Sequence, residues 1–339
     1  MRDTLQKIID HHPLTEPEAH DAMQRIMAGE ATAVQIAALL VALRMKGETV
    51  EEITGFARAM RAAAVKVEAR SRPLVDTCGT GGDGSHTFNI STAAAFLAAG
   101  AGVKVAKHGN RAASSQCGSA DVLEALGVNI NLSPEQVARC IDEIGIGFLF
   151  ARTFHPAMRH AAPVRSELGV RTVFNLLGPL TNPAGATRQV MGVFDARWVE
   201  PIAHVLKNLG AERAFVVHGA GGLDEISTLG ETQVAEVGPE GILSYTIAPE
   251  DFGIARAAPA DLRGGAPPQN AAMILECLSA APSPRRDIAL LNAAAAIVVA
   301  GLAKDLREGL ERARHAADSG AAREKLEALR AFSQTMEED

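Results

Sequence analysis

The amino-acid sequence changes its hydrophobic pattern at Pro73, and this change constrains the fold more than any other feature. Before Pro73, apolar residues recur at helical spacing, as in 22–27 and 36–43, and no strand-like alternation occurs. Thr15 opens a sequence typical of a helix capping box. The sequence therefore predicts an all-helical N-terminal domain over residues 1–70.

After Pro73, short β-branched runs alternate with helical segments, which is typical of an α/β domain whose strands are mainly parallel. We expect strands near 74–75, 103–105, 190–194 and 214–217, and helices near 91–100, 119–127, 133–143, 197–209 and from 284 onward. The predicted fold class is α/β: a small all-helical N-terminal domain plus a large α/β domain, 71–339, with a mainly parallel central sheet. Two loops rich in proline and glycine, 178–185 and 258–268, are candidate hinges or surface excursions.

Composition narrows the class of ligand. The 339 residues carry a formal net charge of −7, whereas proteins that bind nucleic acid or anionic membranes are more often basic. We therefore expect no nucleic-acid partner and no membrane partner. The N-terminus does not resemble a signal peptide, and the four cysteines lack zinc-type spacing. These features predict a cytoplasmic protein with reduced thiols.

A glycine run, GTGGDG (79–84), follows the first expected strand. Its spacing matches a dinucleotide-binding loop, but the residues after it are poor helix formers. Lysines also stand where that fold needs an acidic residue for the ribose. The run lacks the Gly-Lys-Ser/Thr end of a Walker A loop as well. We interpret it as part of a cradle for another phosphate-rich ligand.

Two further segments add hydroxyl groups and positive charge to this cradle. One precedes and begins the next helix, whose free N–H groups can bind phosphate oxygens; its polar residues are Thr87, Asn89, Ser91 and Thr92. The other is KHGNRAASS (107–115), which supplies cations, hydroxyls and a flexible backbone. The alternative interpretation of the first segment is that it only caps the helix.

Asp224 and Glu225 place two carboxylates side by side. A divalent cation that rests on a bound pyrophosphate takes such oxygen ligands. On its own, an Asp-Glu pair is more often a solvated turn, so this hypothesis depends on the cradle.

Six segments follow one another along nearly the whole chain: DTCGTGGD (76–83), FNIST (88–92), KHGNR (107–111), GSADVLEALG (118–127), RTVFNLLGPLTNP (171–183) and GLDE (222–225). Together they resemble the anthranilate phosphoribosyltransferase family, of the nucleoside-phosphorylase-like class. Several long motifs in the same order make the resemblance specific.

The resemblance implies a fold and a reaction. The family binds its substrates between a helical and an α/β domain, and a segment near 163–186 returns to the helical domain. Its reaction transfers the 5-phosphoribosyl group of phosphoribosyl pyrophosphate (PRPP) to the amine of anthranilate, by an oxocarbenium-like displacement at C1′. The products are N-(5-phosphoribosyl)anthranilate, an intermediate of tryptophan biosynthesis, and pyrophosphate. The implied cofactor is Mg²⁺, two per subunit, and the implied assembly is a homodimer through the helical domain.

The resemblance also implies roles for individual residues. The implied PRPP contacts are Gly79, Gly82, Asp83, Thr87, Asn89, Ile90, Ser91, Thr92, Lys107, His108, Gly109, Asn110, Arg111, Ala112, Ala113, Ser114, Ser115 and Ser119. The implied anthranilate contacts are Gly79, Asn110 and Arg165, and the implied metal ligands are Ser91, Asp224 and Glu225. The candidate catalytic residues are Lys107, His108 and Arg165.

These three candidates suit different tasks. Lys107 neutralises the leaving pyrophosphate, and Arg165 grips the carboxylate of the acceptor with two parallel hydrogen bonds. His108 either assists proton transfer or only orients and packs. The chain departs from the family pattern at 151–154, where it reads Ala-Arg-Thr-Phe, and at Ser166 and Cys117. We expect the departures at 151–154 and Ser166 to affect acceptor binding more than reaction type.

Two other functions remain open on the same fold. A pyrimidine nucleoside phosphorylase would carry a Lys-His-Ser-Thr-Gly-Gly phosphate loop, which this sequence lacks. A non-catalytic binding protein, for example for nucleic acid, would be expected to have lost the carboxylate pair or the glycine cradle and to be basic. This acidic chain keeps both motifs.

Overall fold

A computed structural model describes residues 1–112 and 116–335. Its helices are α1 (Arg2–Ile9), α2 (Glu16–Met27), α3 (Ala33–Lys46), α4 (Val50–Ala63), α5 (Ile90–Gly100), α6 (Ser119–Ala125), α7 (Pro134–Arg139), α8 (Ala151–Phe154), α9 (Ala162–Leu168), α10 (Phe174–Leu177), α11 (Val199–Asn208), α12 (Pro267–Cys277), α13 (Pro284–Val299), α14 (Leu306–Asp318) and α15 (Ala321–Thr335). Its strands are β1 (Val75–Gly79), β2 (Val105–Gly109), β3 (Ile146–Phe150), β4 (Arg188–Gly192), β5 (Arg213–Gly219), β6 (Thr232–Gly238) and β7 (Gly241–Ile247).

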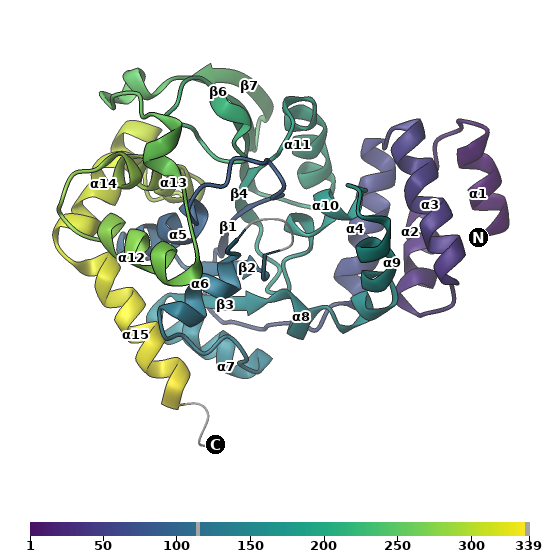
Figure 1. The fold of residues 1–339 in the computed structure, drawn as a ribbon, viewed down its shortest axis with the longest axis horizontal. Coiled ribbons are helices and arrows are strands. Elements are labelled where there is room, and N and C mark those ends of the chain that lie inside the picture. Colours follow the sequence, from purple (N-terminus) through teal and green to yellow (C-terminus); the bar gives the residue numbers. More distant parts are fainter. Residues whose placement is uncertain (113–115, 336–339) are drawn as a thin grey trace.

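The first four helices form a bundle at one end of the molecule (Figure 1). Thr15, Thr32 and Thr49 each begin a helix with a reciprocal capping box, so the free N–H groups of the first turns have partners. Gly47, at a positive φ of 90°, ends α3, a conformation that favours glycine. The predicted all-helical N-terminal region is confirmed.

The strands form one seven-stranded sheet in the order β3-β2-β1-β4-β5-β6-β7. Neighbouring strands from β3 to β5 are parallel, whereas β6 and β7 are added as an antiparallel hairpin. The predicted mainly parallel sheet is confirmed, and the carboxyl ends of its parallel strands meet at one edge.

Helices cover both faces of the sheet. On β5, Phe215 and Val217 pack into a core with α5 and α13, while Ala214 and Val216 pack into a second core with α11. This alternation is the two-residue period of a strand that is buried on both faces. The second core continues into the helical bundle, so the bundle is joined to the α/β region by packed side chains.

The chain returns to the bundle between β3 and β4. Val164, Phe174 and Leu177 share a core with α2, α3 and α4, and Figure 1 shows α9 against the bundle and α10 between the bundle and the sheet. Residues 179–184 are buried, so the loop at 178–185 is not a surface excursion.

Several strands differ from the sequence-based expectation. The predicted strands at 74–75 and 103–105 continue to Gly79 and Gly109, so Lys107 and His108 lie on β2 and not in a loop. Strands β3, β6 and β7 were not predicted from the sequence. The helix expected at 133–143 changes from α to π geometry at Cys140. No helix within the described residues is long and apolar enough to cross a membrane.

Candidate active site

The site lies where the strand order changes direction. From β1 the chain moves outward to β2 and β3 on one side, then returns to β4 on the other side of β1. In open α/β sheets, ligands bind beyond the carboxyl ends of the strands at such a switch point. A cleft of about 390 Å³ opens there, lined by the glycine run, the start of α5, the end of β2, Arg165 and the carboxylate pair.

The glycine run is held against Asp224. The Gly81 N–H donates to Asp224 Oδ2 at 2.7 Å. A Cβ atom added at Gly79 would lie 2.2 Å from the same oxygen, and one at Gly192, the last residue of β4, would lie 1.6 Å from Asp224 O. Only glycine at the ends of β1 and β4 therefore lets Asp224 sit at the switch point.

Burial raises the proton affinity of both carboxylates. Burial, with the nearby charge of Asp83, raises the pKa of Asp224 to about 7. Burial and the neighbouring Asp224 raise the pKa of Glu225 well above its ordinary value. Glu225 Oε1 accepts the Ser91 N–H at 3.1 Å, which ties the pair to the first turn of α5. This cluster of negative charge favours a cation.

The residues present fit a magnesium ion that is shared with a ligand. Within residues 1–112 and 116–335, no three His, Cys, Asp or Glu side chains form a complete metal-ligand set. Mg²⁺ usually keeps several waters and is bound by one or two carboxylates plus substrate phosphates. Asp224 and Glu225, facing a cradle of N–H groups and hydroxyls, match that requirement.

Lys107 places a positive charge near the carboxylates of Asp76 and Glu225. It is only 4% exposed, and its Nζ donates to Thr77 O at 2.6 Å and to Ser91 Oγ at 3.3 Å. Burial lowers the pKa of Lys107, while the negative charge of Asp76 behind it opposes that shift. An ammonium group therefore lies between the end of β1 and the start of α5, next to the carboxylates.

The polar side chains at the start of α5 do not cap the helix. Asn89 is the N-cap residue, but no side chain caps the helix there. Thr92 Oγ1 is buried and has no hydrogen-bond partner within the described part of the chain. The interpretation that these polar residues only cap the helix is wrong.

His108 does not suit proton transfer. It is 7% exposed, and its ring lies 5.1 Å from that of His155, centroid to centroid. Burial, with the nearby His155, lowers the pKa of His108 to about 3. A neutral imidazole of such low basicity is a poor general base near neutral pH. The structure supports the alternative role, in which His108 packs and orients the end of β2.

The segment after β2 folds onto α6. Ser119 Oγ lies 3.2 Å from Asn110 O, and Arg111 forms ion pairs with Asp121 and Glu124. Asn110, Arg111, Ala112 and Ser119 line the cleft, as the resemblance implies. The implied contacts Ala113, Ser114 and Ser115 lie outside the described residues.

Arg165 lies on the side of the cleft formed by the returning segment. Its guanidinium lies 5.0 Å from the ring centroid of Phe174, and both side chains line the cleft. This pairing offers a cation for a carboxylate beside an apolar ring. Of the positions that depart from the family pattern on this side, only Ala151 reaches the cleft, whereas Arg152, Thr153 and Ser166 are exposed outside its lining.

The cleft brings together every implied site residue that the structure describes. It also contains residues to which no individual substrate contact was assigned from the sequence: Cys78, Thr80, Gly81, Ser85, His86, Phe88, Cys117, Gly118, Ala151, Phe174, Asn175, Gly178 and Pro179. Most of them fall inside the motifs at 76–83, 88–92, 118–127 and 171–183, so motif membership was the available signal.

Comparison with known proteins agrees with this geometry. Residues 71–323 match the family model described as "Glycosyl transferase family, a/b domain", and residues 2–64 match "Glycosyl transferase family, helical bundle domain". The chain is similar to the anthranilate phosphoribosyltransferases of Symbiobacterium thermophilum, at 57% identity over 98% of both chains, and of Rubrobacter xylanophilus, at 59% over 96% of both.

Solved structures show the same relationship. The crystal structure of anthranilate phosphoribosyltransferase from Thermus thermophilus superposes with a TM-score of 0.93 at 52% identity, over 98% of this chain and 99% of that one. The Saccharomyces cerevisiae enzyme in complex with PRPP and Mg superposes with a TM-score of 0.91 at 28% identity, over 98% and 97%. These similarities support the transferase hypothesis and not the phosphorylase or binding-protein alternatives. The chain belongs to the anthranilate phosphoribosyltransferase family.

Proposed function

We propose that this chain transfers the 5-phosphoribosyl group of PRPP to the amine of anthranilate in the cleft at the switch point. One observation carries the proposal: the glycine cradle, Lys107 and the Asp224–Glu225 pair are hydrogen-bonded to one another or to Ser91 in a cleft that Arg165 and Phe174 also line. The first group suits a pyrophosphate with its cation, and Arg165 with Phe174 suits an aromatic carboxylate.

The pyrophosphate leaves with the electron pair of the C1′–O bond. The N–H groups of the glycine run, the hydroxyls of Ser91 and Thr92, and Lys107 bind the departing oxygens. Mg²⁺ held by Ser91, Asp224 and Glu225 would supply further positive charge on those oxygens. The fixed positions of these groups stabilise the charge that develops as the bond breaks.

The acceptor is oriented from the opposite side. Arg165 binds the anthranilate carboxylate, Phe174 packs on its ring, and Asn110 and Gly79 lie near the amine. The new bond joins the amine nitrogen to C1′, and the amine loses its proton after the bond has formed. Because an electrophilic C1′ needs no strongly basic partner, a neutral His108 is compatible with the reaction.

The experiment mixes the full-length protein with anthranilate, PRPP and Mg²⁺ and follows the loss of anthranilate fluorescence. We expect the fluorescence to fall, and we expect this fall to stop when a chelator removes Mg²⁺. Asp224→Asn and Glu225→Gln should each lower kcat/KM by about 100-fold or more, because each removes one preorganised charge. Glu240→Gln, an exposed carboxylate on the β6–β7 turn, is the matched control. Unchanged fluorescence with a folded wild-type protein would overturn the proposal.

Two magnesium ions per subunit are part of the proposal. Ser91 and Glu225 would hold one, and Asp224 and Glu225 the other. Titration of Mn²⁺ in the presence of PRPP, read by electron paramagnetic resonance, counts the ions. One ion per chain would contradict this assignment.

We also propose a homodimer through the helical bundle. Val34, Val41 and Met45 follow one another along α3 and are exposed, Val34 to 79% and Met45 to 77%. The opposite face of α3 is buried against its own bundle, so this helix is apolar on both sides. A second copy of the chain fits an apolar stripe of this kind.

We further propose that the boundary between the two domains lies at residues 70–71 and that the protein is cytoplasmic. The cis peptide Arg72–Pro73 lies next to that boundary, between the bundle and β1. None of the four cysteines, all within the described residues, forms a disulfide, which suits a reducing compartment. Limited proteolysis and cell fractionation test these two statements.

A further inference from the structure

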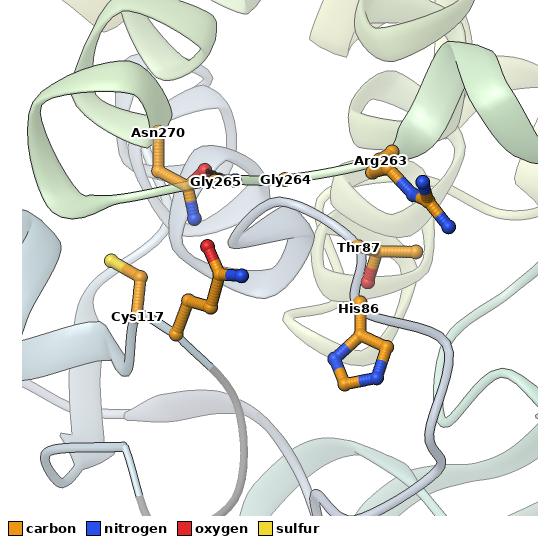
Figure 2. A pocket seen from close by; sticks show the side chains of 8 residues that line it. His86, Thr87, Cys117, Arg263, Gly264, Gly265 and Asn270 are labelled. Carbon is orange, nitrogen blue, oxygen red and sulfur yellow. Dashed lines mark hydrogen bonds between the residues drawn. The ribbon is translucent and has the colours of Figure 1, made fainter.

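Asn270, in the first turn of α12, is a buried polar residue that neither the motifs nor the proposed chemistry uses. Its side chain is 1% exposed, although it lies far along the sequence from the glycine cradle. It lines a second cavity of about 280 Å³ that borders the cleft and shares His86, Thr87 and Cys117 with it. Figure 2 shows the Asn270 amide pointing from α12 into this cavity.

A chain of amide hydrogen bonds runs from Asn270 to the cradle. Asn270 Oδ1 accepts the Gly265 N–H at 2.7 Å. Asn270 Nδ2 donates to Asn89 Oδ1 at 2.9 Å, and Asn89 Nδ2 donates to Cys117 O at 3.1 Å. Three segments that are distant in sequence are therefore joined by two side-chain amides.

The hydrogen bond from the Gly265 N–H to Asn270 fixes the donor and acceptor in the other hydrogen bonds of this series. A backbone N–H can only donate, so the atom of Asn270 that faces Gly265 must be the oxygen. Its NH₂ group then faces Asn89, which must present its own oxygen in return. The NH₂ group of Asn89 is left to donate once to Cys117 O and once more elsewhere. Asn89 lines the cleft.

The surrounding backbone keeps this geometry rigid. The Phe88 N–H donates to Leu262 O at 3.0 Å, and the Gly264 N–H donates to His86 O at 2.9 Å. Segment 262–265 is thus tied to the residues just before Asn89. Asn89 has no capping bond to α5, so Asn270 and Cys117 alone set its amide within the described residues.

We propose that Asn270 is a positioning residue for PRPP: it holds the Asn89 amide so that an N–H, and not the oxygen, faces the phosphate oxygens. The inference rests on the proposed PRPP site. Without Asn270, the Asn89 amide turns over or rotates freely, and an oxygen that repels phosphate occupies the place of a donor.

The test measures PRPP binding to the full-length protein by isothermal titration calorimetry with Mg²⁺. Asn270→Asp keeps the acceptor for the Gly265 N–H but replaces the donor, so Asn89 must turn its NH₂ group toward the new carboxylate. We expect the Kd for PRPP and its KM to rise about tenfold. The KM for anthranilate should stay within about twofold, since Arg165 is untouched.

A double-mutant cycle separates positioning from added charge. In an Asn89→Ala background, Asn270→Asp should cost less than about twofold in Kd, because no amide remains to be oriented. Gln269→Glu is the matched control: it adds the same charge at the exposed neighbouring position and keeps the oxygen that accepts the Ala266 N–H. It should bind PRPP like the wild type.

The possible outcomes of this cycle each support or contradict the positioning role of Asn270. A tenfold loss in both backgrounds, or none in either, overturns the positioning role of Asn270. If the wild type itself does not bind PRPP, the proposed function fails, and this is seen before any variant is compared. If Asn270→Asp does not unfold cooperatively, Asn270→Ala replaces it in the same cycle, with an expected loss of about threefold.

Discussion

Gly79 shows how the absence of one side chain makes room for a buried carboxylate, that of Asp224. Gly79→Ala would place a methyl group 2.2 Å from Asp224 Oδ2, so the carboxylate must move away from the cradle. We expect kcat/KM to fall by about 100-fold, since displacement of a reacting group by about 1 Å costs this much. Steady-state kinetics measure it. Gly238→Ala, with no atom within 4 Å of the added carbon, is the control, and equal activity of both variants would contradict the explanation.

Buried His155 contributes to the pH dependence of stability. Burial lowers the pKa of His155 to about 4, whereas the pKa in an unfolded chain is near 6.5. Between these pH values the unfolded chain binds more protons, so the free energy of unfolding decreases as pH falls, by at most about 1.4 kcal/mol per pH unit for this group. We expect His155→Phe to make this dependence shallower.

Urea unfolding at several pH values measures how steeply the free energy of unfolding depends on pH in the wild type and in His155→Phe. His12→Gln, at an exposed position of the helical bundle, controls for the substitution itself. A slope in His155→Phe equal to that of the wild type would show that His155 is not held neutral by burial.

The start of α4 depends on a buried charge. Glu52 is fully buried, and its carboxylate binds Lys46 Nζ, the Thr49 N–H and the Leu14 N–H, each at 2.9 Å. Glu52→Ala leaves an uncompensated lysine in the bundle. We expect a loss of about 3–5 kcal/mol in the free energy of unfolding. Glu51→Ala, one residue earlier and exposed, should change it by less than about 0.5 kcal/mol in the same denaturant titration.

The elements were predictable from sequence where the signals were local. The helical bundle followed from apolar spacing and from the cap at Thr15, because these act within one turn. β3 was missed, since the short apolar run 146–150 fits a buried strand or a buried helix equally well. The strand that carries Lys107 was expected to end before it, because its polar residues suggested a loop and their burial depends on tertiary contacts.

The site was predictable only in part, because some of its contacts are local in sequence and others are not. Motifs identified the residues that line the cleft, but the contact of Asp224 with Gly79 and Gly192 joins positions far apart in the chain. Asn270 carried no signal at all, since an isolated asparagine at a helix start is an ordinary residue. Its role depends on which backbone N–H it meets, and this is known only once the chain has folded.

At the scale of the whole molecule, the exposed stripe on α3 predicts assembly. Val34→Glu combined with Met45→Glu should yield a monomer in light scattering coupled to size exclusion, because two charges would be buried at the proposed interface. Leu243→Glu, which replaces a 64% exposed leucine on β7, is the matched control and should leave the dimer intact. A monomeric wild type would contradict the proposed homodimer.

The seating of Asp224 on Gly79 and Gly192 also has a consequence for how the enzyme is made. The ribosome delivers the glycine cradle and Lys107 long before the carboxylates that complete the site. A chain made only to this point contains the residues of the cradle but lacks Asp224, which holds the Gly81 N–H. A product that stops before residue 224 lacks both carboxylates that the proposed metal site needs. A chain cut short there therefore cannot carry out the proposed reaction.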